Sequence, residues 1–446
     1  MANNRKIFKL IIIGAGPSGM GTALSASTHG LQASDILLLE TNPRPGAKLL
    51  LTGNGRCNLT QDLEIEDLAR HYYGQEKFVS PALRALPPQA LCNFFKEAGL
   101  ELTHEGNKVY PRSNRALDVL LCLEEQLRQA KINLKCREEV TQVKWDQVGN
   151  TTPSPHFIVK TKSGKIFSGE NLVVASGGRS YPKTGSKGFA YQLALELGLK
   201  LQTTGPAMAP LYINYSQVRG QDLAGLSLSS VTGSLVSLNR PHLSMSDLSS
   251  KTPRKKYSPV ISGDLLFTHK GLSGPLALDL SRYAAREPKL PLAIQISFIN
   301  SDLEVLENWQ AKSLDKQFKN LLTELLPQRL VKFFTDENLL SKRSQHLLKQ
   351  KAKYLHKVDW QYFCEDINKQ LWPLQHLASY QEAMATTGGI ALNQVKAHDF
   401  SVKQLPQLHF VGECLDIDGQ CGGFNLQFAF ASGYLAGKAI ARQYKH

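Results

Sequence analysis

The start of the chain constrains the fold most strongly. Residues 7–13 form a largely aliphatic run, typical of a strand buried on both faces, and residues 14–19 then fit the pattern G-x-G-x-x-G. The small residues of 20–28 predict a helix, and residues 35–39 predict a second strand that ends at Glu40, 21 residues after the last glycine. A strand, a glycine turn, a helix and a second strand with a terminal acid predict a dinucleotide-binding βαβ unit.

Each position of the glycine motif has a physical role in such a unit. Gly14 permits the tight turn, Gly16 lets the backbone approach a pyrophosphate, and Gly19 lets the helix pack closely on the strand. Ser18 lies in the same motif at the start of the helix, where free N–H groups and the helix dipole attract phosphate. Glu40 is expected to accept hydrogen bonds from the adenosine ribose. An ordinary glycine turn is the alternative interpretation.

The length of 446 residues is too great for one core and predicts two or three domains at about 150 residues each. The fold class we expect is α/β, with a Rossmann-like domain split between the two ends of the chain. Its first part covers 1–200, including short strands at 156–161, 165–168 and 172–175. We expect a β-barrel-like insert at 201–300, a helical insert at 301–357, and a return through barrel and nucleotide domain at 358–446.

Two further features favour FAD over NAD as the bound dinucleotide. The loop at 45–58 carries glycine, asparagine and lysine and is suited to fold over a long cofactor. Residues 411–413 resemble the strand-glycine-acid element by which flavoproteins hold the ribityl chain, and 422–425 are expected to start a helix facing the flavin. A plain strand-turn-helix is the alternative for this second element. With the first motif, the cofactor-binding candidates are Lys48, Gly53, Gly55, Arg56, Asn58, Gly177, Gly178, Gly412, Glu413, Gly423, Phe424 and Asn425.

The charged and amide side chains among these candidates have expected roles. Lys48 and Arg56 would neutralise a pyrophosphate or a reduced flavin anion, and ion pairing with other side chains is the alternative for both. Asn58 and Asn425 would form hydrogen bonds with the edges of the flavin.

Four segments of the chain resemble a known family. They are 46–60, with Gly-Arg-Cys-Asn at 55–58; 263–275, with Phe-Thr-His at 267–269; 387–389; and 412–427. By these motifs the chain resembles the YhiN/BaiN/RdsA-type FAD-dependent oxidoreductases, also labelled the aminoacetone oxidase family. The resemblance spans nearly the whole chain and implies a split FAD domain with a barrel insert and a helical insert. It also implies either rRNA dihydrouridine synthesis with FAD and NADH, or a role in steroid dehydroxylation.

The charge distribution favours an RNA substrate. The chain has 52 Lys and Arg against 38 Asp and Glu, a net charge of +14. Residues 311–357 hold eleven Lys and Arg against four acids, which is half of the whole surplus, and 251–256 hold a second basic cluster. We therefore expect rRNA to bind between Lys312 and Lys357 through its phosphates. A solvated helix face beside a mobile loop is the alternative interpretation.

The resemblance suggests a reaction in which NADH-derived hydride reaches C6 of a uracil by way of FAD, while an acid protonates C5. Cys57 is one candidate acid, because the resemblance places it in a signature loop. His269 is the other, from the second signature segment. For Cys57 the alternative is packing or hydrogen bonding near the cofactor, and for His269 the alternatives are substrate binding and a purely structural role. An FAD enzyme acting on a small apolar or amine substrate, and a non-catalytic RNA-binding flavoprotein, remain open as functions.

The remaining features exclude several classes of protein. Seven scattered cysteines include no C-x-x-C pair, which argues against a metal site and suits free thiols in a reducing cytosol. No stretch approaches roughly 18 consecutive apolar residues, and no signal peptide is recognisable, so we expect a cytoplasmic protein without a membrane span. The sequence leaves the oligomeric state open.

Overall fold

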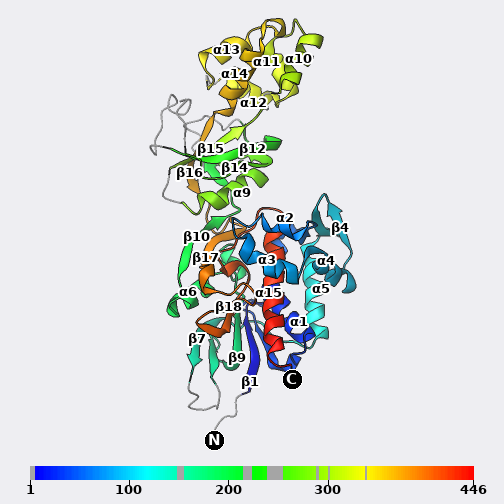
Figure 1. Cartoon of the computed structure of the whole chain (residues 1–446), viewed down its shortest axis with the longest axis vertical. Helices are drawn as coiled ribbons and strands as arrows, with labels where there is room; N and C mark the ends of the chain where they lie inside the picture. Colours follow the sequence, from blue (N-terminus) through cyan, green and yellow to red (C-terminus); the bar gives the residue numbers. More distant parts are fainter. Residues whose placement is uncertain are drawn as a thin grey trace. The chain divides into compact units, whose positions relative to one another are not determined.

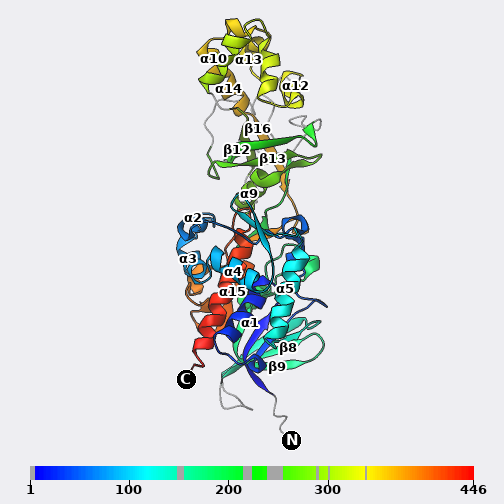
Figure 2. The ribbon, with the colours of Figure 1, turned by 90° about the vertical axis from the view of Figure 1, so that its right-hand side faces the viewer.

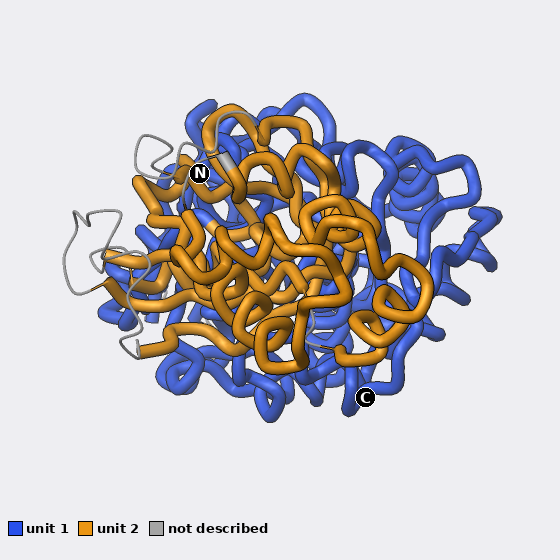
Figure 3. The backbone as a smooth tube through the Cα atoms, turned by 90° about the horizontal axis from the view of Figure 1, so that it is seen from above, with its two compact units in different colours: residues 1–206, 380–446 blue, residues 207–379 orange. Residues whose placement is uncertain are grey.

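The computed structural model describes residues 6–147, 155–213, 223–238, 255–287, 291–299, 302–336 and 339–445. The chain divides into two compact units, coloured separately in Figure 3. Unit 1 comprises Met1–Pro206 and Tyr380–His446, and unit 2 comprises Ala207–Ser379. Two of the basic residues noted above, Lys251 and Arg254, lie outside the described residues.

Unit 1 is built on a largely parallel sheet with the strand order β18-β19-β9-β1-β2-β6. The antiparallel strands β7 and β8 extend it from β9. Every residue of β2 and most residues of β1 are buried, so both faces of the central strands are covered, and α1 packs against both strands. The strands are β1 (Ile7–Ile13), β2 (Ile36–Leu39), β6 (Asn133–Lys135), β7 (Val140–Asp146), β8 (His156–Thr161), β9 (Ile166–Val174), β18 (Ser401–Val402) and β19 (Leu405–Phe410).

The register of the parallel strands brings their carboxyl ends to one edge. Ile13 of β1 lies opposite Leu39 of β2 and Val174 of β9, and Phe410 of β19 lies opposite Val174. The loops that follow these four strands therefore meet at one edge of the sheet, where open α/β sheets bind ligands.

Strand β9 differs from the expectation of two short strands at 165–168 and 172–175. β9 runs without a break through Gly169, where a Cβ would come within 2.7 Å of the Ile11 side chain.

Two helices from opposite ends of unit 1's sequence pack side by side on the sheet, as Figures 1 and 2 both show: α1 (Pro17–Thr28) and α15 (Phe424–Arg442). A Cβ at Gly433 would lie 2.1 Å from Ser18 O, and one at Gly437 would lie 2.4 Å from Thr22 O. The other helices of the unit are α2 (Ile65–Ala69), α3 (Glu76–Ala85), α4 (Pro88–Glu97), α5 (Ala116–Gln129) and α6 (Phe189–Glu196). Its smaller sheets are β3-β5-β4 (Thr60–Gln61, Lys108–Pro111, Leu102–Glu105) and β10-β17 (Leu201–Ala207, Ala385–Ile390).

Unit 2 contains a closed barrel with the strand order β11-β14-β13-β12-β15-β16. The barrel closes because β16, which follows the helices in the sequence, pairs with both β15 and β11. Helix α9 (Gly274–Ala284) packs against β13, and this helix was not among the elements predicted from the sequence. The strands are β11 (Leu211–Ile213), β12 (Ser227–Ser237), β13 (Ile261–Phe267), β14 (Gly271–Ser273), β15 (Leu292–Ser297) and β16 (Leu371–Leu377). The expectation of a split Rossmann-like domain with a barrel-like insert and a helical insert is confirmed.

The helices between β15 and β16 cluster around buried aromatic rings. Trp309 and Trp360 pack edge to face at 5.4 Å between centroids, and Phe318 packs on Phe363 at 4.8 Å. Such pairs exclude water and fix the helices relative to each other. The helices are α10 (Leu303–Lys312), α11 (Phe318–Leu321), α12 (Gln328–Asp336), α13 (Lys342–Leu348) and α14 (Lys357–Asn368).

The expected domain boundaries differ somewhat from the borders of the two units. Strand β10 (Leu201–Ala207), which we expected in the insert, pairs with β17 of unit 1. The barrel and the helical segment fall together in unit 2, whose borders lie after Pro206 and after Ser379. A separate helical domain at 301–357 therefore stays a prediction.

Candidate cofactor site

The glycine motif occupies the turn between β1 and α1. Gly14 has a φ of +99°, and a Cβ there would lie 2.6 Å from Ala175 O. A Cβ at Gly19 would lie 1.8 Å from Gly14 O, so both positions exclude any side chain. A Cβ at Gly16, the N-cap of α1, would meet nothing within 4 Å. The motif is therefore closely packed at two positions and open at the third, where a diphosphate would approach the helix N-terminus.

Glu40 lies buried at the carboxyl end of β2 and stabilises the glycine turn. Its Oε2 accepts a hydrogen bond from the backbone N–H of Ala15 at 2.9 Å. Its Oε1 accepts from the backbone and side-chain amides of Asn42 at 2.9 and 2.7 Å. A carboxylate has about four acceptor sites, so these three bonds leave room for a ribose hydroxyl. The ribose-binding role of Glu40 stays a prediction.

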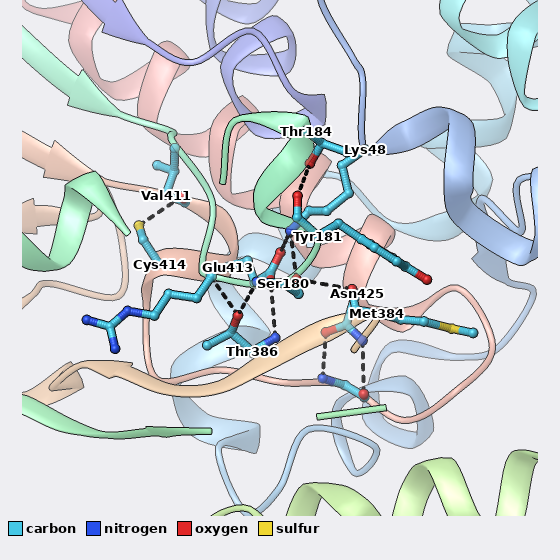
Figure 4. A network of polar contacts seen from close by, with 12 residues as sticks. Lys48, Ser180, Tyr181, Thr184, Met384, Thr386, Val411, Glu413, Cys414 and Asn425 are labelled. Atoms are coloured by element: carbon cyan, nitrogen blue, oxygen red, sulfur yellow. Dashed lines mark hydrogen bonds and ion pairs between the residues drawn. The ribbon is translucent and has the colours of Figure 1, made fainter. Parts of the chain in front are cut away.

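Lys48 and Glu413 form an ion pair with each other (Figure 4). Lys48 Nζ also donates to Ser180 Oγ at 3.0 Å, and Glu413 Oε1 accepts from Ser180 Oγ at 2.8 Å and from Thr386 N at 2.9 Å. The side chains of Lys48 and Glu413 are 22% and 18% exposed, so the pair is largely buried. The ion-pair alternative for Lys48 is thus present, and the network joins four separate segments of unit 1.

The glycines that follow β9 make room for this network. A Cβ at Gly178 would lie 2.4 Å from Thr386 Oγ1 and 2.9 Å from Glu413 Oε1. Gly177 has a φ of +70°, and a Cβ there would lie 3.1 Å from Ser186 Oγ. Gly412, with a φ of +73°, lies against the Ser18 side chain in the same way. These glycines shape the edge of the sheet through close packing. Their direct contact with the cofactor stays a prediction.

The N-terminus of α15 presents a buried acceptor without a partner. Gly423 is the N-cap with a φ of +95°, and a Cβ there would lie 2.8 Å from Asn58 Oδ1. Asn58 is only 8% exposed, and its Oδ1 has no hydrogen-bond partner among the residues that the structure describes. An unsatisfied buried acceptor is unfavourable by about 1–3 kcal/mol, so this position suits a ligand that carries an N–H donor.

Phe424 and Asn425 have structural partners beside that helix start. Asn425 Oδ1 accepts from Gly419 N at 2.8 Å, and its Nδ2 donates to Gly419 O at 3.0 Å. Phe424 stacks on His71 with 4.4 Å between ring centroids. Asn425 thus clamps the turn before the helix. Because the amide oxygen has a second lone pair and the amide nitrogen a second hydrogen, the expected contact of Asn425 with the flavin stays a prediction.

Arg56 is held on the surface of the loop that contains Gly53 and Gly55. It forms an ion pair with Glu105, donates to Asn114 Oδ1 at 2.8 Å, and lies 4.3 Å from the Tyr110 ring centroid. Gly53 and Gly55 have φ values of +57° and +84°, which let the loop turn back on itself. The ion-pair alternative for Arg56 is thus present, and its expected role at the pyrophosphate stays a prediction.

The two candidate acids lie in different units. Cys57 is fully buried in the apolar core of unit 1, and burial raises the pKa of its thiol to about 12. A side chain without exposed surface cannot contact a ligand in this conformation, so the structure argues against Cys57 as the acid and favours the packing alternative. His269 is exposed in the tight turn between β13 and β14, which Thr268 N closes by donating to Gly271 O at 2.7 Å.

Sequence reasoning missed the residues that complete the site. Ser180 contacts both members of the Lys48–Glu413 pair, and Thr386 of β17 donates its backbone N–H to Glu413. Only the neighbouring glycines at 177–178 and 388–389 drew attention to these two segments of the sequence. Around the α15 turn, Gln61 Nε2 donates to Gly422 O at 2.6 Å. Tyr72 OH donates to Phe424 O at 2.8 Å. No local pattern marks these side chains, because their partners lie more than 350 residues away.

The described residues also limit other kinds of site. Among them, no group of three or more His, Cys, Asp or Glu side chains could hold a metal ion. No helix in the described part of the chain is long and apolar enough to cross a membrane.

The open position at Gly16, the acid at the end of β2 and the unsatisfied Asn58 Oδ1 fit a long dinucleotide with a polar ring system. This fold and site define the class of flavoproteins with an FAD-binding Rossmann domain. The HI0933-like protein Rossmann domain model matches residues 8–439, and the chain belongs to this family of FAD-dependent oxidoreductases.

Two curated relatives match the chain over nearly its whole length. The 3-dehydro-bile acid delta(4,6)-reductase of Clostridium scindens is 28% identical and covers 97% of this chain and 98% of its own. The ribosomal RNA dihydrouridine synthase of Escherichia coli is also 28% identical, over 96% of each chain.

The fold of the chain is similar to that of 3-ketosteroid delta1-dehydrogenase from Sterolibacterium denitrificans. The TM-score is 0.51 at 12% identity, over 98% of this chain and 100% of that one. At this identity the likeness shows the fold alone.

Proposed function

We propose that the protein reduces a uridine of large-subunit rRNA to dihydrouridine, with NADH as the source of hydride. The observation that carries the proposal is the basic surplus of residues 311–357, which suits a polyanionic substrate. The name of the Escherichia coli relative, a ribosomal RNA dihydrouridine synthase, supports the choice of substrate.

In this proposal, FAD supplies hydride transfer when it is bound. The open N-terminus of α1 at Gly16 binds its diphosphate, and Glu40 accepts from its ribose. Asn58 Oδ1 accepts from the polar edge of the ring system beside Gly423. Of the two candidate acids only His269 is exposed, so it is the candidate for proton delivery to the uracil.

A second function has its own support. The relative from Clostridium scindens is named as a reductase of a bile acid, which is a small and largely apolar substrate. If the present chain acts on such a molecule, the positive charge of unit 2 plays no part in catalysis. A non-catalytic RNA-binding flavoprotein is the third alternative from the sequence, and nothing further favours it.

Two experiments separate these functions. Anaerobic NADH should bleach the flavin absorbance of the holoenzyme, and an unchanged spectrum would favour the non-catalytic alternative. Large-subunit rRNA from a deletion strain should lack one dihydrouridine that the parent strain contains. An identical dihydrouridine content in the two strains would eliminate rRNA as the substrate and leave the small-molecule reductase.

A further inference from the structure

The positive charge of the helical segment is concentrated in two short stretches. Residues 312–319 and 349–357 together contain seven lysines and one acid, Asp315. The intervening residues 320–348 contain four Lys and Arg and three acids. Nearly all of the local surplus therefore belongs to these two stretches, which we call the lysine ribbon.

The structure brings the two stretches of the ribbon side by side. Gln317 and Lys351 form an antiparallel bridge. Phe318 N donates to Gln350 O at 2.8 Å, Ala352 N to Lys316 O at 3.0 Å, and Lys353 N to Leu314 O at 3.2 Å. The buried Phe318 and Ala352 fix this pairing to the aromatic core beneath it. The ribbon is thus a fixed surface, and its lysines come from two parts of the sequence.

Part of the ribbon's charge is neutralised within unit 2. Asp315, with a side chain 73% exposed, pairs with Lys351 at 3.3 Å and with Lys353 at 2.8 Å. Two acids outside the ribbon pair with two more of its lysines: Glu324 with Lys316 at 3.8 Å, and Glu307 with Lys357 at 2.9 Å.

Three lysines of the ribbon have no acidic partner among the described residues. Lys312, Lys319 and Lys349 are exposed and form no ion pair with any described residue. A cation without a protein partner is the kind that releases counterions when it meets a phosphate.

The ribbon also displays an aromatic ring. Tyr354 is 59% exposed, and Lys353 Nζ lies 5.4 Å from the centroid of its ring. Single-stranded nucleic acids bind to surfaces that combine lysines for the phosphates with an exposed ring for stacking a base. The ribbon has both features, whereas a surface that recognised phosphate charge alone would not need an exposed ring.

We infer that the lysine ribbon is the RNA-docking surface of the protein, with Lys312, Lys319 and Lys349 on phosphates and Tyr354 stacked on an unpaired base. This inference rests on the proposed function, since it deepens its choice of RNA as substrate. It assigns RNA contact to one surface. The other basic residues of the helical segment should contribute less to RNA affinity than the ribbon lysines; these residues are Arg329, Lys332, Lys342 and Arg343.

The first test compares two double variants that change the charge equally. Lys319→Gln with Lys349→Gln removes two unpaired lysines of the ribbon. Lys332→Gln with Lys342→Gln removes two exposed, unpaired lysines outside it. Affinity for a labelled single-stranded RNA oligonucleotide is measured by anisotropy over a salt series, on FAD-loaded protein.

The ribbon double variant should lose on the order of tenfold in affinity, and its salt slope should fall by about 1.4. The control double variant should stay within about twofold of the unmodified protein. Equal losses in the two double variants would overturn the inference.

Two single variants check that the losses come from the surface itself. Asp315→Asn frees Lys351 and Lys353, so RNA binding should tighten severalfold, which damage to the fold would not produce. Tyr354→Ala should weaken binding of single-stranded RNA about tenfold, and Tyr354→Phe should keep it. Unchanged affinity in Asp315→Asn and Tyr354→Ala would contradict the assignment.

The outcomes separate this inference from the function on which it rests. If the ribbon double variant binds RNA normally while the unmodified protein forms dihydrouridine, the assignment of RNA docking to the ribbon is wrong and the proposed function stands. If the unmodified protein neither binds RNA nor forms dihydrouridine, both fail. If the ribbon double variant loses binding to phosphatidylserine vesicles and keeps RNA binding, the surface serves a membrane and the inference is overturned.

Discussion

At the scale of single residues, the Lys48–Glu413 pair is the contact on which the site geometry depends most. Glu413 is largely buried, and its carboxylate also holds Ser180 and Thr386. Removing Lys48 leaves a buried negative charge without a cation, and breaking such pairs is more harmful than replacing both partners. Lys48→Met should therefore lower the free energy of unfolding by about 2–3 kcal/mol.

Chemical denaturation of the FAD-free protein measures this change. The double variant Lys48→Met with Glu413→Gln should recover at least half of the loss, because no unpaired charge remains. A double variant as unstable as the sum of the two single variants would mean that the residues do not interact.

Cys57 carries a prediction about pH. Burial raises the pKa of its thiol from 9.0 to about 12 in the folded protein, so the folded state favours the protonated thiol. The stability from this group is fully present below pH 9 and is lost as the pH rises from 9 towards 12. Cys57→Ala should therefore lose less stability than the unmodified protein between pH 8 and pH 10.5, with urea unfolding as the measurement. A parallel decline in both proteins would show that the thiol is not buried.

At the scale of elements, the contact between α1 and α15 joins the two ends of unit 1. Cβ atoms at Gly433 and Gly437 would strike the backbone oxygens of Ser18 and Thr22, and backbone cannot move aside as a flexible side chain can. Gly433→Ala should thus destabilise the protein by about 2 kcal/mol and weaken FAD binding, because it displaces the helix that carries the glycine motif. Flavin fluorescence quenching during FAD titration gives the dissociation constant. Lys438→Ala on the same helix is the control and should bind FAD normally.

The elements also show what the sequence could predict. The βαβ unit was predictable because its glycines, helix and terminal acid are contiguous. The barrel insert was predictable because the residue pattern of the sequence changes after residue 200. The roles of Lys48 and Arg56 could not be settled, because their partners Glu413 and Glu105 are 365 and 49 residues away. Burial of Cys57 was equally invisible, since a positive φ of +61° within a glycine-rich loop turns its side chain into the core.

At the scale of the whole molecule, our proposals assign cofactor binding to unit 1 and RNA binding to unit 2, so salt should affect the two differently. Raising the salt concentration from about 50 to 200 mM should weaken binding of rRNA fragments by at least tenfold, because counterion release drives that binding. NADH-driven bleaching of the flavin should change by less than about twofold over the same range. Anaerobic stopped-flow absorbance and RNA anisotropy measure the two effects. Equal salt sensitivity would contradict the assignment of RNA contact to unit 2.

The order of the units along the chain has a consequence for synthesis on the ribosome. Unit 2 is continuous, so all six barrel strands and the helices are available once residue 379 has emerged. Unit 1 still lacks β19 and α15 at that stage, and with them Glu413 and Gly423. A nascent chain should therefore complete its inserted unit first and become able to retain a flavin only after the later segment has been translated.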